Sequence, residues 1–281
     1  MRTFAELRQG LARRLWRVAS GYAWPDSPAR PPLGTALAPG ARAGLAHHPR
    51  WPEGGHPERW EFPAWLDAGA SPWIAALKRL YEEPLTFPAA VSPEVGLLLH
   101  ALARNIRPRT VIETGTHLGV STLWLASGLE AGALLHTFDL FLPIRRAAHN
   151  PHEMLAGREE FVRGWVGQAG LADRVRVHKG DSAFEVRRLH AELREHGGVH
   201  LAFIDGDHAP EGVRQDFLAV EPVLTTGGYV LFHDTFPEYS GCDGPRRFID
   251  RLGEMAVGTY QICDLCLAPV NHGLTILRRV G

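Results

Sequence analysis

The stretch Thr110-Val-Ile-Glu-Thr-Gly-Thr-His-Leu-Gly-Val-Ser-Thr122 decides how the rest of this sequence is interpreted. It begins as a buried strand, and a helix is expected to start near Gly119. Glycine at 115 and 119 lets other groups approach the backbone closely, because it has no Cβ. Ligands of open α/β sheets bind beside such a turn. The spacing Gly-x-x-x-Gly differs from the Gly-x-Gly-x-x-Gly of folds that hold a dinucleotide pyrophosphate.

Around this turn, helices alternate with short apolar runs. Helices are predicted over 71–81, 92–105, 119–129, 157–170, 182–196, 209–223 and 245–256, and strands over 110–114, 134–138, 174–178, 199–204, 228–232, 258–264 and 273–278. Strands separated by helices favour a parallel sheet that is covered on both faces. The last two strands are close in sequence, which favours an antiparallel edge. The predicted fold is therefore α/β, with a doubly wound, mostly parallel sheet and an antiparallel edge strand.

The first 85 residues differ in composition from the rest and are predicted to form an N-terminal arm, ahead of a catalytic domain over 86–281. Residues 3–18 have the spacing of an amphipathic helix, which would pack on its own domain or on a second copy of the chain, or lie on a membrane surface. Residues 21–63 are rich in Pro, Gly and Ala and indicate an extended segment. Trp51, Trp60 and Trp65 suggest that part of this segment orders against the catalytic domain.

The bulk composition excludes several classes of protein. A formal net charge of −1 gives no general attraction to nucleic acid or to an anionic membrane. No apolar run approaches the roughly 20 residues that a membrane span needs, and the N-terminus lacks the apolar segment of a signal peptide. Three cysteines are too few for a disulfide scaffold. A cytoplasmic protein without nucleic-acid or membrane partners is expected.

Acidic residues follow the second and third predicted strands. Asp139 ends the second strand, where a carboxylate can accept both hydroxyls of a ribose. Asp181 and Ser182 follow the third strand, and a carboxylate there suits an adenine amino group. The alternative is that Asp181 or Ser182 only caps the helix that follows.

Two further strands deliver acids and histidines to the same edge. Asp205, Asp207 and His208 follow the fourth strand, and His233 and Asp234 end the fifth. Neighbouring strand ends lie about 5 Å apart, so Asp205 and Asp234 can face one site and hold a hard divalent cation such as Mg²⁺. Asp207, His208 or His233 could take a proton from a hydroxyl. Alternatively, Asp207 makes only an Asx turn, His208 caps a helix, and His233 is a packed core residue.

Taken together, Glu113-Thr-Gly-Thr-His-Leu-Gly-Val-Ser121, Asp139, Gly180-Asp181, Ile204-Asp-Gly-Asp-His208 and Gly227-Gly228 with His233-Asp234 resemble class I, Rossmann-like methyltransferases that use S-adenosylmethionine (SAM). Within this class, residues 90–280 are similar to metal-dependent small-molecule O-methyltransferases of the catechol and macrocin types. The resemblance implies that SAM contacts Glu113, Gly115, Asp139 and Asp181. The further predicted SAM contacts, on the same strand ends and turns, are Thr116, Gly119, Ser121, Ser182 and Asp205. The resemblance also implies a divalent metal at Asp205 and Asp234, and a base at Asp207.

The sequence departs from this family beside the fifth strand. The family carries a second acid or an Asn next to the metal-binding Asp234, whereas this chain has His233 and Thr235. The metal would then use His233, or bind more weakly with water, or be absent.

Three alternatives remain open at this point. An NAD-dependent oxidoreductase would share the sheet and the ribose-binding acid, and a non-catalytic protein of this fold could act through the arm. Cys263-x-x-Cys266, with Cys242 and His272, could instead form a zinc site. The leading prediction is O-methylation of a small molecule, a natural product or a sugar, whose identity would depend on the arm and on loops 140–156 and 235–247.

Overall fold

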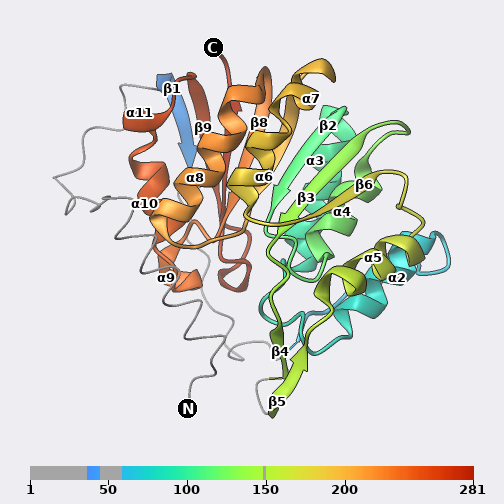
Figure 1. The fold of residues 1–281 in the computed structure, drawn as a ribbon. Helices are drawn as coiled ribbons and strands as arrows, with labels where there is room; N and C mark the ends of the chain where they lie inside the picture. The colour runs from blue at the N-terminus through green and yellow to red at the C-terminus, as the bar shows by residue number, and fades with distance from the viewer. Residues whose placement is uncertain (1–36, 45–58, 148–149) are drawn as a thin grey trace. The chain divides into compact units, whose positions relative to one another are not determined.

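The computed structural model describes residues 37–44, 59–147 and 150–281. Its centre is an eight-stranded sheet with the order β1-β9-β10-β8-β7-β2-β3-β6 (Figure 1). The strands are β1 (Leu37–Gly44), β2 (Thr110–Thr114), β3 (Leu134–Asp139), β6 (Val175–Lys179), β7 (Val199–Ile204), β8 (Leu224–His233), β9 (Tyr260–Leu265) and β10 (Leu274–Arg279).

The predicted α/β fold is confirmed. Strands β2, β3, β6, β7 and β8 pair in parallel, and β10 runs antiparallel to both of its neighbours, β8 and β9. The antiparallel strand β10 therefore lies near one edge of the sheet, with β9 and β1 beyond it. Strand β1 adds to β9 in parallel, in a segment for which the sequence predicted only extended chain.

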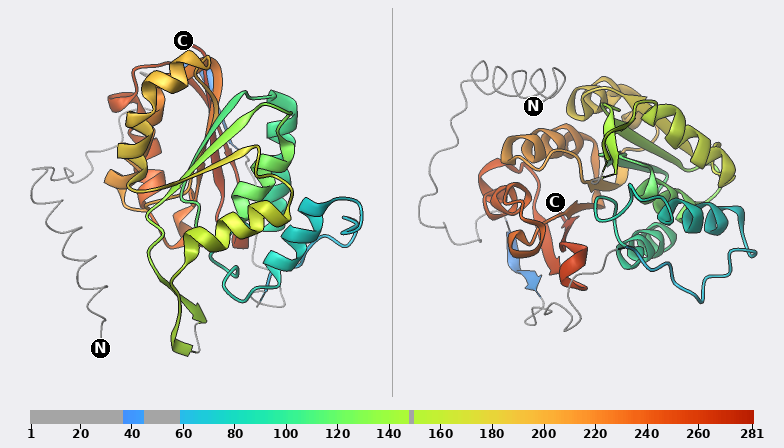
Figure 2. Two further views of the ribbon diagram at one scale, coloured as in Figure 1. Left: turned by 45° about the vertical axis from the view of Figure 1, so that its right-hand side comes forward. Right: turned by 90° about the horizontal axis from the view of Figure 1, so that it is seen from below.

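Helices cover both faces of the sheet, as Figure 2 shows. One face carries α2 (Pro72–Tyr81), α3 (Pro93–Ile106), α4 (Val120–Gly128) and α5 (Arg158–Gln168), and the other carries α6 (Ser182–Arg188), α7 (His190–Glu195), α8 (Pro210–Val220), α10 (Gly244–Asp250) and α11 (Leu252–Met255). The helices on each face pack against the sheet and form a separate apolar core with it. Helix α3 begins where the sequence predicts, because Ser92 Oγ accepts the Val95 N–H at 3.3 Å and Pro93 needs no partner for its nitrogen.

Some predicted boundaries were wrong. The helix predicted over 182–196 is divided between α6 and α7 at Leu189, and the one over 245–256 is divided between α10 and α11 at Arg251. The helix predicted over 209–223 leaves α-helical geometry at Val220, because the ring of Pro222 cannot donate to a helical carbonyl and crowds the preceding turn. The sequence did not indicate the short helix α9 (Pro237–Ser240) or the separate two-stranded sheet of β4 (Ile144–Ala147) and β5 (Asn150–Leu155).

Beyond β1, the segment from Trp60 to Leu66 of the N-terminal region packs on the α2–α5 face. Trp60 is buried and its Nε1 donates to the Thr86 carbonyl at 2.9 Å, whereas Trp65 is 72% exposed. The helix predicted over 3–18 and Trp51 lie outside the described residues. The domain boundary between 85 and 86 stays a prediction.

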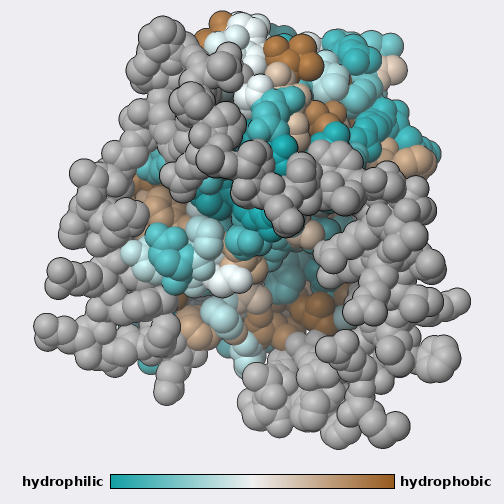
Figure 3. Space-filling model, turned by 90° about the vertical axis from the view of Figure 1, so that its left-hand side faces the viewer, coloured by the Kyte–Doolittle hydropathy of each residue, from teal (hydrophilic) through white to brown (hydrophobic). Residues whose placement is uncertain are grey.

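Among the described residues, the helices are too short or too polar to cross a membrane. Figure 3 shows the face that carries α10 and α11, where hydrophobic and hydrophilic residues are interspersed wherever grey atoms do not cover them.

Candidate functional site at the carboxyl edge of the sheet

The predicted site residues meet at one edge because of the strand register. Thr114, the last residue of β2, pairs with Phe138 on β3 and with Ile204 on β7, and Ile204 pairs with Phe232 on β8. Gly115, Asp139, Asp205 and His233 each follow one of these paired residues directly. The structure therefore brings the glycine turn, the acid after β3 and the acidic centre together, as the sequence predicted.

Gly115 is required by the neighbouring strand. Its φ of +91° is a conformation that favours glycine, and a Cβ at this position would lie 2.1 Å from the backbone oxygen of Asp205. The Gly115 N–H donates to the Phe138 carbonyl at 2.9 Å, so the turn is attached to β3 as well. The sequence suggested that glycine is needed at 115 so that a ligand can approach the backbone. In the structure, glycine is needed because the backbone after β7 occupies the space that a Cβ would fill.

Glu113 is a buried carboxylate at the end of β2. Its Oε2 accepts hydrogen bonds from Thr122 Oγ1 at 2.5 Å and Thr137 Oγ1 at 2.6 Å, while its Oε1 is buried with no hydrogen-bond partner among the described residues. Burial raises the pKa of Glu113 to about 7, against the opposing effect of the Ser121, Thr122 and Thr137 hydroxyls. An unpartnered carboxylate oxygen at this position fits a cationic ligand.

The other residues predicted on the glycine turn are also buried. Thr116 Oγ1 lies 2.5 Å from Thr137 Oγ1 and so extends the hydroxyl chain that ends on Glu113. Gly119 has a φ of +85° and caps α4 at its N-terminus, and Ser121 lies in the first turn of that helix with 6% of its surface exposed. These residues form the wall of the turn.

Asp139 has an ion-pair partner that the sequence did not indicate. Arg158, the first residue of α5, donates to Asp139 Oδ2 at 3.0 Å and to Oδ1 at 3.3 Å. The backbone N–H groups of His117 and Phe141 also donate to this carboxylate, at 2.8 and 2.6 Å. Its acceptor positions are therefore largely filled, and a ribose hydroxyl could bind there only if Arg158 moved.

The turn after β6 carries Asp181 and Ser182. Asp181 Oδ1 accepts the Phe184 N–H at 2.8 Å and so caps α6, which is the local role weighed above, and the Asp181 side chain is exposed. Ser182 Oγ donates to Asp216 Oδ1 at 2.5 Å. Burial raises the pKa of Asp216 to about 7. Neither arrangement prevents an adenine from contacting the turn.

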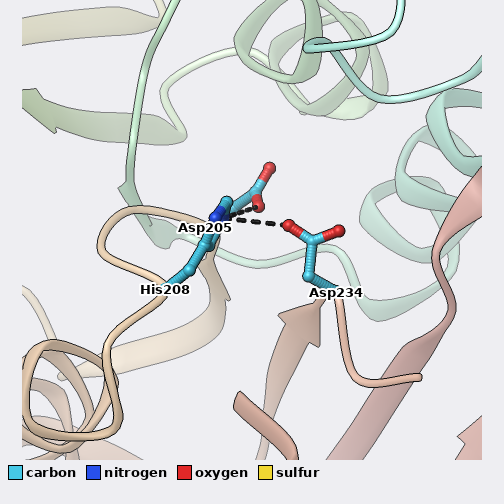
Figure 4. A group of neighbouring side chains, drawn as sticks. All are labelled: Asp205, His208 and Asp234. Atoms are coloured by element: carbon cyan, nitrogen blue, oxygen red, sulfur yellow. Dashed lines mark ion pairs between the residues drawn. The ribbon is translucent and has the colours of Figure 1, made fainter. Parts of the chain in front are cut away.

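The acidic centre brings Asp205 and Asp234 together with histidines. His208 Nε2 lies 2.9 Å from Asp234 Oδ2 and 3.7 Å from Asp205 Oδ1 (Figure 4). His233 Nδ1 lies 3.3 Å from Asp205 Oδ1 and 3.5 Å from Asp234 Oδ1. Asp205, His208 and Asp234 each offer a ligand atom within 4.8 Å of the others, which makes them the described group able to hold a metal ion.

Two more side chains reach this centre from distant parts of the chain. His272 Nδ1 lies 3.1 Å from Asp234 Oδ1, and Cys242 Sγ lies 3.7 Å from His208 Nδ1. The sequence singled out both only as partners of a zinc site with Cys263 and Cys266. Those two cysteines contact backbone carbonyls instead, and none of the cysteines belongs to a described metal-capable group. No local motif marks His272, because only the insertion of β10 beside β8 brings it to Asp234.

The charges in the centre reinforce one another. Contacts with Asp205 and Asp234 raise the pKa of His208 to about 11. Burial opposes protonation of His233, but the two carboxylates outweigh it and raise its pKa to about 10. The facing histidines hold the pKa of Asp234 and of Asp205 below the usual range, against the opposing effect of burial. A divalent cation would therefore release protons as it bound, and the carboxylate and imidazole donors fit such an ion.

Asp207 lies outside this cluster. Its Oδ1 accepts the Ala209 N–H at 3.0 Å, which is an Asx turn ahead of α8, and its side chain is exposed. Of the three predicted bases, His233 is buried, whereas Asp207 and His208 are accessible from solvent.

Residues 112–235 match the profile of a protein family described as "Methyltransferase domain". A protein of Mycobacterium sp. (strain JLS), provisionally named an O-methyltransferase, is 33% identical over 150 residues, which are 51% of this chain and 56% of that protein. A protein of Mycolicibacterium smegmatis with a similar name is 34% identical over 146 residues, covering 51% and 59%. The chain thus spans little more than half the length of these relatives.

Solved structures share the fold. The O-methyltransferase TomG of Streptomyces achromogenes, involved in tomaymycin synthesis and solved with SAM, aligns with a TM-score of 0.55 at 24% identity, over 73% of this chain and 90% of that one. An O-methyltransferase of Bacillus cereus, solved with S-adenosylhomocysteine (SAH), aligns with a TM-score of 0.56 at 21% identity, over 74% and 91%.

Proposed function

We propose that this chain, whose residues 112–235 match a family described as a methyltransferase domain, transfers the methyl group of SAM to a hydroxyl oxygen of a small molecule. The observation that carries the proposal is the shared edge of the sheet. There the glycine turn, the buried Glu113 with its unpartnered oxygen and the centre of Asp205 and Asp234 lie side by side. A donor held at the turn would have its methyl group close to an acceptor at the acidic centre.

The donor side rests on the turn between β2 and α4. SAM carries positive charge on its sulfur and on its amino group, and Glu113 provides the buried negative charge that can compensate it. Thr116, Gly119 and Ser121 would shape the wall, and Asp181 and Ser182 would face the adenine. Binding of the ribose hydroxyls at Asp139 would require Arg158 to leave part of that carboxylate.

The acceptor side rests on the ends of β7 and β8. The acceptor oxygen attacks the methyl carbon in line with the breaking bond to sulfur, the thioether leaves as SAH, and the hydroxyl proton passes to a base. Asp207 and His208 are the candidates that face solvent. The protein would contribute mainly proximity and orientation.

A divalent cation such as Mg²⁺, when bound, would lower the pKa of the acceptor hydroxyl and hold its oxyanion. Asp205 and Asp234 would be its carboxylate ligands, and His233 lies close enough to both to contribute. The two carboxylates face each other at one edge, which supports a cation between them.

The acceptor class follows from the resemblance to catechol and macrocin-type enzymes. A natural product or a sugar with a free hydroxyl is proposed, in a cytoplasmic reaction that needs no nucleic acid and no membrane. Association of two copies through the N-terminal arm also stays a proposal.

Calorimetric titration of the purified full chain with SAM, SAH and NAD tests the function. SAM and SAH are expected to bind with a 1:1 stoichiometry, and NAD is not. With labelled SAM and a panel of catechols and sugars, Asp205→Ala should lower methyl transfer by about 100-fold or more, since it removes charge from the reacting centre. Asp173→Ala, at an exposed acid, is the matched control. Tight NAD binding without any response to SAM would overturn the proposal.

A further inference from the structure

We propose that the centre of Asp205, Asp234 and His208 selects a transition-metal ion with affinity for nitrogen, of the kind represented by Co²⁺ or Zn²⁺, in preference to Mg²⁺. The inference rests on the proposed function, because it names the ion that would serve the same acceptor site. It differs from the family expectation of an all-oxygen magnesium site in giving an imidazole a place among the ligands.

The distances fit a shared ion. His208 Nε2 is 2.9 Å from Asp234 Oδ2 and 3.7 Å from Asp205 Oδ1. Two donors that each lie about 2.1 Å from one ion are about 3.0–3.5 Å apart when they occupy neighbouring positions of an octahedron or a tetrahedron. His208 and Asp234 already stand near this spacing, and the ligand atoms of all three side chains lie within 4.8 Å of one another. Figure 4 shows the His208 ring directed at both carboxylates.

A buried oxygen supplies an independent indication of a ligand. Asp234 is 5% exposed, and its Oδ1 is buried without a hydrogen-bond partner among the described residues. His272 Nδ1 at 3.1 Å and His233 Nδ1 at 3.5 Å lie close to this oxygen, yet neither forms an aligned hydrogen bond with it. A buried carboxylate oxygen that lacks an aligned donor is costly unless a further group, such as a cation, satisfies it.

The ligand atoms at the centre indicate which ion it would prefer. Mg²⁺ prefers oxygen ligands in near-ideal octahedral geometry and retains several waters, whereas imidazole nitrogen favours the later divalent ions. Here three imidazoles, those of His208, His233 and His272, border two carboxylates. An ion shared by Asp205 and Asp234 would have the His208 nitrogen among its protein ligands.

Cys242 orients the histidine that would bind. Its Sγ lies 3.7 Å from His208 Nδ1, on the opposite side of the ring from the carboxylates. A contact of this kind on the second ring nitrogen holds a metal-binding imidazole in one orientation, with Nε2 toward the ion. With His208 assigned to the ion, the exposed Asp207 remains as the group that receives the acceptor proton.

The test uses the metal-stripped full chain. Calorimetric titration with Mg²⁺, Mn²⁺, Co²⁺ and Zn²⁺ is expected to give one site, with Co²⁺ bound at least about 100-fold more tightly than Mg²⁺. His208→Asn should weaken Co²⁺ binding by about tenfold or more, change Mg²⁺ binding much less, and alter the visible absorption of bound Co²⁺. His196→Asn, at an exposed histidine on the far end of β7 from the centre, is the matched control for adventitious binding.

Three results would overturn the inference: equal affinity for Mg²⁺ and Co²⁺, a Co²⁺ affinity and spectrum that His208→Asn leaves unchanged, or the absence of a 1:1 site. If His208→Asn does not fold, as judged by circular dichroism, His208→Gln takes its place. Titration of the same samples with SAH separates the two proposals. SAH binding without a His208-dependent ion defeats only this inference, and ion binding without SAH binding defeats the proposed function.

Discussion

At the scale of single residues, Glu113 has the most unusual environment in the donor half of the site. It is fully buried, yet it has hydroxyl partners on only one of its two oxygens. Because its pKa in the folded chain is about 7, above its ordinary 4.5, the folded state favours the protonated form. Its contribution to stability is therefore present below pH 4.5 and is lost as pH rises toward 7. A bound cation would reverse this preference.

SAM affinity is accordingly expected to rise by about fivefold or more between pH 6 and 7.5, since the ionised fraction of Glu113 grows over that interval. Glu113→Gln should bind SAM weakly at both pH 6 and pH 7.5, and its SAM affinity should not change with pH over this range. Calorimetry across this range measures the effect, with Glu94→Gln, on α3, as the control that should keep the wild-type slope. A wild-type profile that is flat would show that Glu113 does not compensate the donor's charge.

At the scale of elements, the turn between β2 and α4 depends on its contact with β7. Gly115 combines a left-handed backbone with a space too small for a methyl group. Gly132 offers a matched comparison, because its φ of +86° is similar but no atom lies within 4 Å of the position of a Cβ.

Gly115→Ala is expected to lower the free energy of unfolding by more than about 2 kcal/mol, because backbone strain and a steric clash add together. Gly132→Ala should cost only about 1 kcal/mol, from strain alone. Urea denaturation followed by circular dichroism measures both values. Equal losses in the two variants would mean that the contact with the Asp205 carbonyl has no energetic importance.

The same elements show what a sequence can reveal. Strands β2 and β7 were predicted with their observed bounds, because buried parallel strands are continuous apolar runs that end at a glycine or an acid. The prediction that Gly115, Asp139 and Asp205 lie close together needed only the parallel arrangement of the strands that precede them. Arg158 and His272 could not be found in this way, because each reaches its carboxylate through the packing of an element distant in sequence.

At the scale of the whole molecule, the N-terminal region and the sheet share one core. Leu77 and Leu80 on α2 are fully buried, and Tyr81 Oη donates to the Val91 carbonyl at 2.9 Å and accepts from Trp124 Nε1 at 3.0 Å. Trp60 belongs to the same apolar cluster. The change in composition near residue 85 is thus not accompanied by a break in packing.

A fragment of residues 34–281 is expected to unfold cooperatively on heating. A fragment of residues 86–281 should not, because it lacks the five buried residues of α2, of which the large side chains are each worth about 2–4 kcal/mol. Scanning calorimetry of the two fragments and the full chain compares them. If the shorter fragment melts cooperatively within about 3 °C of the longer one, the domain boundary at 85/86 is also a stability boundary.

The close approach of Gly115 to the Asp205 carbonyl has a consequence for how the two half-sites respond to their ligands. Thr114 O also accepts the Asp205 N–H at 2.9 Å, so neither strand end can shift without displacing the other. We therefore expect a ligand bound at the donor turn after β2 to change the affinity of the acidic centre after β7 for its cation. Thermodynamic linkage makes this effect reciprocal. If a bound cation changes the affinity for the methyl donor by some factor, the bound donor changes the affinity for the cation by the same factor.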